Sequence, residues 1–275
     1  MTDRDLLACA ITLALVACHA PPSAPEPSVH GAAPLSAAAG SEAPRVEADD
    51  PDGVESEEGT EGLEAAFDPV SPANVSPAAG LLALEALREL SLMRASRYSH
   101  RTRVDEAEGT FDFDCSGLVG YALARAAPDA LVALQRATVK RPLAKHFVSF
   151  LASLPAGGEG RWRRVARATD LAPGDLIAWL KPDDVSSKNT GHVMIVREAA
   201  PLSAPAAGVV FVAVIDSTSV RHGASDSRSR MHASGLGEGT IGLVLDAEGA
   251  PVGYQWSRGS RARTHATTIA LGRLD

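Results

Sequence analysis

Residues 19 to about 77 cannot build a hydrophobic core, so whatever folds in this 275-residue chain lies mainly outside them. The segment is rich in Ala, Pro, Ser, Gly and Glu, and its apolar residues follow neither the helical nor the strand period. Burial there is too small to offset the entropy lost on ordering. We therefore predict a disordered tether over residues 18–77 and a globular domain over residues 78–275. A passive low-complexity spacer is the alternative to a functional tether.

The charge distribution supports the same division. Residues 19–80 carry 12 acidic residues and one basic residue, whereas residues 81–275 carry 24 basic and 20 acidic residues. The formal net charge of the chain is -8, so we expect no nucleic-acid partner. The chain has no run of about 18 apolar residues, which argues against a membrane-spanning helix in the mature protein.

The first residues have the pattern of an export signal. Arg4 lies in a short polar head, and residues 6–17 form an almost unbroken apolar run. The run ends in Leu15-Val16-Ala17-Cys18, which resembles the bacterial lipobox, where the cysteine is acylated. We predict a lipoprotein-type signal peptide over residues 1–17, lipidation of Cys18 and a membrane-anchored location on the periplasmic side of the bacterial cell envelope. An ordinary cleaved signal and an uncleaved anchor are the alternatives.

The first part of the domain has helical periodicity. We expect a helix beginning at Pro77 with Ser76 as its N-cap, followed by helices at 115–127, 129–138 and 142–153. The apolar side of the first helix comprises Leu81, Leu84, Leu87, Leu90 and Met93, with Glu85, Arg88 and Glu89 off it. Two glycines inside the second helix, Gly117 and Gly120, indicate close approach to a neighbouring group.

After Ala168 the apolar runs shorten to strand length. Strands are predicted at 175–180, 193–196, 209–215, 241–245, 252–256 and 267–271, with a hairpin turn over 246–251. Helices followed by an antiparallel sheet predict an α+β domain.

Cys115 is the leading candidate for a reactive group. Cys9 and Cys18 belong to the targeting segment, so Cys115 is the one thiol of the mature domain and can make no internal disulfide. Asp114 is a capping residue, Ser116 is a small polar neighbour, and Cys115 falls in the first helical turn. There the unpaired N–H groups and the positive end of the dipole favour a thiolate and can receive an oxyanion. A buried, unreactive cysteine is the alternative.

A cysteine nucleophile needs a base, and His192 is the best-placed histidine. It begins a predicted strand directly after Gly191, which allows close backbone approach. If this strand pairs with the next one, Asp216 at the end of that strand lies near His192 and can orient its ring. A structural histidine and an aspartate that starts a turn are the alternatives.

The same region offers a competing interpretation as a metal site. His192, Asp216, His222 and His232 could in principle collect around an ion. The sequence lacks HExxH and paired CxxC spacing. We therefore predict neither a metal nor another cofactor.

Four strings in series resemble the NlpC family of papain-like cell-wall cysteine peptidases. They are Asp114-Cys115-Ser116-Gly117-Leu118-Val119, Leu171-Ala172-Pro173-Gly174-Asp175-Leu176, Gly191-His192-Val193-Met194-Ile195 and Val214-Ile215-Asp216-Ser217, and the match covers about residues 95–220. The resemblance implies a papain-like domain whose nucleophilic cysteine lies on a helix packed against an antiparallel sheet, with a histidine and a third polar residue on adjacent strands. By motif these are Cys115, His192 and Asp216.

The chain departs from the family pattern at two positions. The family tyrosine lies in an aromatic, glycine-rich stretch before the cysteine, whereas Tyr98 stands in Arg97-Tyr98-Ser99-His100-Arg101 without those glycines. The third site residue is often His in the family and is Asp216 here, a change that would make His192 a stronger base. We assign Tyr98, Asp114 and Ser116 to the substrate or oxyanion region; a half-buried structural role is the alternative for Tyr98.

The resemblance implies cleavage of peptidoglycan peptide stems, often between D-glutamyl and a diamino acid. We thus expect a monomeric, tethered cysteine hydrolase that cleaves amide bonds in those stems. Arg221, Arg228 and Arg230, in the stretch 220–239, are expected to form a substrate-binding lid, with a solvated loop as the alternative. The competing functions are a non-catalytic peptidoglycan-binding lipoprotein and an amidase or acyltransferase that acts on another amide.

Overall fold

The computed structural model describes residues 76–198, 208–229, 233–258 and 262–275. These residues belong to a compact unit that spans Leu63–Asp275. The predicted signal peptide, Cys18 and almost all of the predicted tether lie outside the described residues. Within the described ranges, no helix is both long and apolar enough to cross a membrane.

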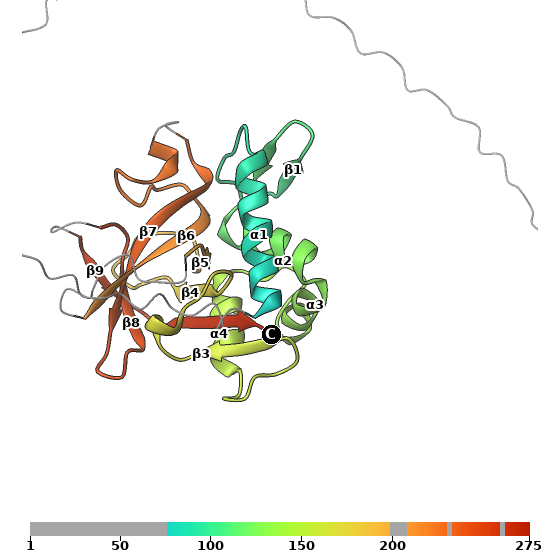
Figure 1. Cartoon of the computed structure of the whole chain (residues 1–275). Helices are drawn as coiled ribbons and strands as arrows, with labels where there is room; N and C mark the ends of the chain where they lie inside the picture. Colours follow the sequence, from blue (N-terminus) through green and yellow to red (C-terminus); the bar gives the residue numbers. More distant parts are fainter. Residues whose placement is uncertain (1–75, 199–207, 230–232, 259–261) are drawn as a thin grey trace, which may run out of the picture. The chain divides into compact units, whose positions relative to one another are not determined.

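The main sheet is antiparallel throughout and has eight strands in the order β3-β10-β4-β5-β6-β7-β8-β9 (Figure 1). The strands are β3 (Trp162–Val165), β4 (Leu176–Leu180), β5 (Gly191–Val196), β6 (Val209–Thr218), β7 (Gly235–Leu245), β8 (Pro251–Gln255), β9 (Thr264–Ala266) and β10 (Ile269–Leu274). A separate hairpin pairs β1 (Arg103–Asp105) with β2 (Thr110–Asp112). This sheet and its few helices confirm the predicted α+β class.

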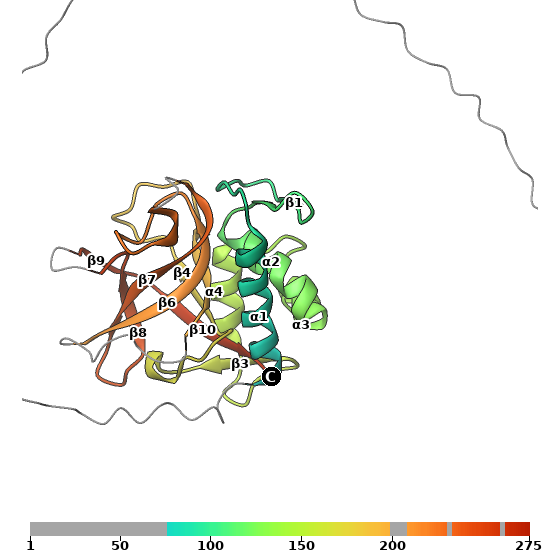
Figure 2. The ribbon, with the colours of Figure 1, turned by 45° about the horizontal axis from the view of Figure 1, so that its top comes forward.

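Four helices lie together beside the sheet (Figure 2). They are α1 (Pro77–Leu92), α2 (Cys115–Ala126), α3 (Pro128–Ala137) and α4 (Ala144–Ser153). The second helix packs on β5 and β6, the fourth packs on β4, β5 and β10, and the first and third flank the second. All four match predicted helices to within a few residues. The hairpin β1–β2, β3 and β9 were not predicted.

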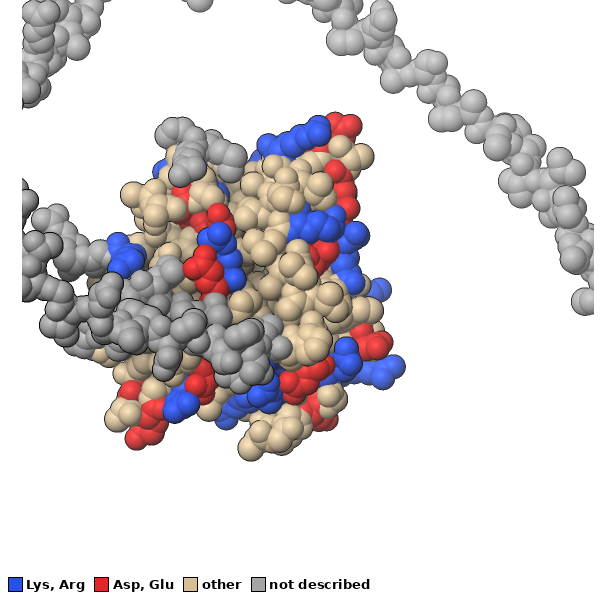
Figure 3. Space-filling model, viewed as in Figure 1, with Lys and Arg blue, Asp and Glu red and all other residues tan. Residues whose placement is uncertain are grey.

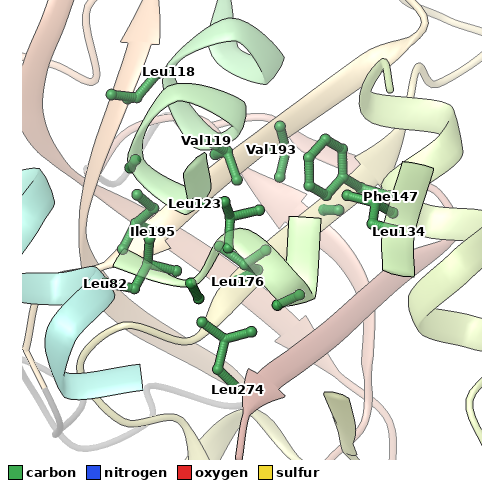
Figure 4. Close-up of a cluster of buried hydrophobic side chains, with 14 of the residues drawn as sticks. Leu82, Leu118, Val119, Leu123, Leu134, Phe147, Leu176, Val193, Ile195 and Leu274 are labelled. Atoms are coloured by element: carbon green, nitrogen blue, oxygen red, sulfur yellow. The ribbon is translucent and has the colours of Figure 1, made fainter. Parts of the chain in front are cut away.

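The two central strands are buried on both faces. In β5, Val193 and Ile195 join the core beneath the helices (Figure 4). Met194 and Val196 join a second core on the opposite face, to which β3, β4, β6, β7, β8 and β10 also contribute. Because successive strand residues point to opposite faces, burial on both faces requires the unbroken apolar runs seen in the sequence.

The predicted core side of α1 is wrong for its first three leucines. Leu81 and Leu84 are 54% and 63% exposed, and Leu87 is also exposed. The buried side comprises Ala78, Ala79, Leu82, Ala83, Ala86 and Glu89. Small side chains let the helix come close to its neighbours. Gly174, at φ +84°, shows how close, because a Cβ there would lie 1.8 Å from the carbonyl oxygen of Ala79.

The two helical glycines have different surroundings. A Cβ on Gly117 would lie 2.9 Å from the hydroxyl of Thr102 and 2.9 Å from the Cβ of Phe113, so the expected close approach is confirmed there. A Cβ on Gly120 would meet nothing within 4 Å, so the same expectation is wrong at that position.

A buried ion pair joins the loop before β4 to the last strand. Arg273 donates from Nε and Nη2 to the two carboxylate oxygens of Asp175, at 2.7 Å each. The backbone N–H of Ala172 donates to the same carboxylate at 2.7 Å. Both oxygens of Asp175 are therefore bound inside the fold. On the face shown in Figure 3, positive and negative side chains are interspersed.

Candidate active site

Cys115 begins the second helix and is buried. Asp114 caps that helix: its Oδ1 accepts hydrogen bonds from the backbone N–H of Gly117 at 2.7 Å and from the hydroxyl of Ser116 at 2.9 Å. A helix provides no carbonyl partner for its first N–H groups, and its dipole puts positive potential at this end. The sulfur atom therefore lies beside N–H donors that can also bind an oxyanion.

The second oxygen of Asp114 holds two basic side chains. Oδ2 lies 3.1 Å from Nδ1 of His100 and accepts from Nη2 of Arg141 at 3.1 Å. Both oxygens of Asp114 therefore have partners, and its predicted role in the substrate or oxyanion region, with that of Ser116, stays a prediction. Their side chains are hydrogen-bonded to each other and fix the start of the cysteine helix.

His192 lies between Cys115 and Asp216. Its Nε2 is 2.6 Å from Oδ2 of Asp216, and Cys115 and Asp216 both act on the ring to raise its pKa. Because Nε2 faces the carboxylate, Nδ1 is the ring nitrogen left for the sulfur. The prediction that strand pairing brings Asp216 to His192 is confirmed as geometry, since β5 and β6 are antiparallel neighbours.

The backbone before His192 takes a form that only glycine adopts readily. Gly191 has φ +145°, and a Cβ there would lie 1.8 Å from the carbonyl oxygen of Trp179. Trp179 pairs with His192 across β4 and β5, and their ring centroids are 5.6 Å apart. The close backbone approach expected at Gly191 is confirmed. It places the imidazole of His192 at the start of β5.

Opposing influences set the charge of the His192 ring. Burial lowers the pKa of His192, but the negative charge of Cys115 and the hydrogen bonds to Asp216 and Cys115 raise it to about 10. Burial raises the pKa of Asp216, but His222, Arg228 and His192 hold it well below its usual value. At neutral pH this arrangement favours the protonated ring of His192, which can act as a proton donor.

The structure brings two further side chains to Asp216. His222 places Nε2 at 2.9 Å from Oδ2, and Arg228 donates from Nη1 to Oδ1 at 2.9 Å. Arg228 also binds both oxygens of Asp226, at 2.8 Å each. The lid prediction for Arg228 is therefore wrong, because this side chain is 0% exposed and occupied by carboxylates. Arg221 is exposed, whereas Arg230 lies outside the described residues.

His192, Asp216 and His222 are close enough to hold a metal ion, with ligand atoms within 4.8 Å of one another. The surrounding groups favour a hydrogen-bonded network instead. Arg228 places a guanidinium 2.9 Å from Asp216, where it would repel a cation. His232, the fourth possible ligand, lies outside the described residues.

Two pockets flank the cysteine and histidine. A pocket of about 220 Å³ contains Cys115 and Arg141, and one of about 350 Å³ contains His192 and Trp256. Their walls share Tyr98, Asn189 and Gly191. An extended substrate could thus lie across both pockets with its scissile bond between them.

Tyr98 lies at the junction of these pockets. The backbone of Tyr98 forms an isolated parallel β-bridge with that of Phe113, two residues before the cysteine. Its hydroxyl accepts a hydrogen bond from Nδ2 of Asn189 at 3.1 Å. Burial and the negative charges of Cys115 and Asp114 raise the pKa of Tyr98. The phenol therefore keeps its proton and can donate it to an oxyanion.

Sequence reasoning missed His222 as a partner of Asp216 and the burial of Arg228. The usable signal was Gly235-Leu236-Gly237-Glu238-Gly239, since alternating glycines inside a strand mark close approach on one face. Comparisons of the chain with protein-family models, curated proteins and solved structures gave no match. The chemistry of the site is therefore argued from the positions of Cys115, His192 and Asp216.

Proposed function

We propose that this chain is a papain-like cysteine hydrolase of the NlpC type that cleaves amide bonds in peptidoglycan peptide stems. The observation that carries this proposal is the alignment of Cys115, His192 and Asp216, with 2.6 Å between the last two. The thiol stands at a helix N-terminus, the base is held by a carboxylate, and donors lie beside both. This arrangement matches what nucleophilic catalysis by a cysteine requires.

The reaction proceeds through a thioester. The Cys115 thiolate attacks the amide carbon, and the electron pair of the carbonyl moves to oxygen, where the N–H of Cys115 and the hydroxyl of Tyr98 stabilise it. His192 gives its proton to the leaving nitrogen as the carbon–nitrogen bond breaks. Water, deprotonated by His192, then attacks the thioester and releases a carboxylate and the thiolate. Asp216 orients the ring throughout.

The smaller pocket supports a carboxylate-rich substrate. Arg141, which is paired with Asp114, and Lys188 line it beside Cys115, and side chains of these two kinds bind carboxylates. Peptidoglycan stems carry several carboxylates. In this proposal, acylated Cys18 and the tether hold the domain near the membrane, within reach of the wall.

The test incubates the purified full chain with peptidoglycan and identifies the soluble fragments by mass spectrometry. We expect stem-peptide fragments from the parent and from Gly120→Ala, and none from Cys115→Ala. The first variant changes the same helix at a position where a Cβ meets nothing within 4 Å, so it controls for substitution in that helix as such. Absence of fragments from the parent, on several wall types and in reducing buffer, would contradict the proposal and favour a binding lipoprotein or another amide substrate.

A further inference from the structure

The chain turns back on Asp216 directly after β6. His222 and Arg228, from the segment between β6 and β7, are both fully buried against it. Oδ2 of Asp216 lies 2.6 Å from His192 and 2.9 Å from His222, while Oδ1 accepts from Arg228 at 2.9 Å. The carboxylate therefore has partners on both oxygens, and one of them is a second imidazole.

Both ring nitrogens of His222 face acceptors. Nε2 faces the carboxylate of Asp216, and Nδ1 faces the carbonyl oxygen of Trp256 at 3.0 Å. Neither oxygen can donate, so both hydrogen bonds form together only when each nitrogen carries a proton. In that form His222 joins Arg228 as a second cation beside the buried carboxylates of Asp216 and Asp226. Buried carboxylates need cationic partners of this kind.

Strand β7 provides the space for these side chains. A Cβ on Gly239 would lie 2.6 Å from Cδ2 of His222, and one on Gly237 would lie 2.8 Å from Cγ of Arg228. Gly237 also pairs with Asp216 across β6 and β7. Glycine weakens a strand interior, so two glycines on one face indicate that this strand is built to admit His222 and Arg228.

We propose that His222 and Arg228 are positioning residues that hold Asp216 against His192, and that His222 does so as an imidazolium. This inference rests on the proposed function, because it assigns their role through the Asp216–His192 pair. Asp216 and His192 face the His222 ring from β6 and β5. From its own segment, Asp226 accepts a hydrogen bond from the backbone N–H of His222 and pairs with Arg228. Trp256, just after β8, and Gly239 of β7 also lie against the ring.

The direction of a pH shift separates this role from a purely structural one. The rings of His192 and His222 are 6.5 Å apart, so loss of a positive charge at His222 raises the pKa of both the thiol and the His192 ring. Arg228 still binds Oδ1 of Asp216 in a His222 variant, so the carboxylate stays near His192 and only the positive charge of His222 is lost. A carboxylate that moved away instead would take a negative charge from the site and lower both pKa values. A local loosening that left the charges in place would move neither.

The experiment measures the alkylation rate of Cys115 by iodoacetamide in the full chain, from about pH 4 to about pH 12, so that an inflection above that of the parent His192 is still observed. Trypsin releases Cys115 within residues 104–125 and both other cysteines within residues 5–45, so mass spectrometry follows this thiol alone. We expect His222→Gln to move both inflections of the rate profile up by about one pH unit. Inflections that stay in place or move down would overturn the proposal. The assay uses no peptidoglycan, so its result is independent of wall cleavage.

A second variant tests the position of the His222 ring and leaves the histidine itself unchanged. Gly239→Ala places a methyl group against the imidazole, and we expect both inflections to rise as in His222→Gln. Gly120→Ala is the matched control, since a Cβ there meets nothing within 4 Å. His146→Gln, on α4, controls for loss of a histidine elsewhere. A Gly239→Ala profile equal to that of Gly120→Ala would count against the proposed seating, even if His222→Gln failed to fold.

Discussion

Replacement of Glu89 by Gln should abolish a large pH dependence of stability. Glu89 lies on the buried side of α1 and is 0% exposed, and neither carboxylate oxygen has a hydrogen-bond partner among the described residues. Burial, together with the negative charge of Glu85, raises its pKa to about 9, and Arg88 and Arg125 offset only part of this. The folded protein therefore holds Glu89 in its neutral form at pH 7.

The magnitude follows from the two pKa values. In the unfolded chain the carboxyl ionises above its ordinary value of 4.5, whereas in the folded protein it stays protonated up to about 9. Between these values unfolding releases a proton, so the free energy of unfolding falls by about 1.4 kcal/mol per pH unit. From about pH 5 to about pH 8 the loss is roughly 4 kcal/mol. Below 4.5 both states are protonated and the contribution vanishes.

The assay is urea unfolding of the parent and of Glu89→Gln at several pH values from about 5 to about 8, with tryptophan fluorescence as the signal of unfolding. Gln carries no titrating proton, so Glu89→Gln should gain roughly 4 kcal/mol relative to the parent from about pH 5 to about pH 8. Glu85→Gln is the control on the same helix. Ion pairing lowers the pKa of Glu85, so its own contribution changes below pH 4.5. Loss of its negative charge also lowers the pKa of Glu89, so the Glu85→Gln curve should keep the downward slope of the parent and depart from it only toward the upper end of the range. A constant difference between Glu89→Gln and the parent would refute the burial of an unpaired carboxyl.

Three further substitutions test the site and the fold. Asp216→Asn should lower kcat/KM about 10³-fold, because the amide does not stabilise the imidazolium; a loss below about tenfold in stem-peptide release would contradict that role. Tyr98→Phe should lower kcat about 10²-fold with little change in KM, since the hydroxyl acts on the oxyanion; equal kcat values would remove it from the mechanism. Arg273→Met should reduce the free energy of unfolding by about 3–5 kcal/mol in urea, because Asp175 loses its buried partner; a loss under about 1 kcal/mol would show that the pair is dispensable.

The parts of the fold that could be predicted were those with one strong local signal. The continuous apolar runs of β4, β5 and β6 indicated strands because both faces of a central strand are buried. Asp114 before a helical pattern placed Cys115 in the first turn, since capping is a local interaction. The approach of Asp216 to His192 followed from pairing of two consecutive strands.

The errors share a different cause. In α1 both the leucine side and the alanine side are apolar, so periodicity alone cannot say which one meets the core. The choice depends on how closely neighbouring segments approach, which the Gly174 contact with Ala79 sets in three dimensions. The lid prediction for Arg228 was wrong for a related reason. Arginine is usually exposed, and Arg228 is buried because the tertiary fold brings two carboxylates to it.

The aspartate at the third site position explains why His222, Arg228 and the glycines of β7 lie around it. A neutral imidazole there, as is frequent in the NlpC family that the sequence resembles, can be buried with few partners. A fully buried carboxylate cannot, because an uncompensated charge inside a protein costs several kcal/mol. Asp216 therefore requires cations on its remaining lone pairs, and His222 and Arg228 meet that need from a segment outside the resemblance. The glycines of β7 follow in turn, since they make the space that those two side chains occupy.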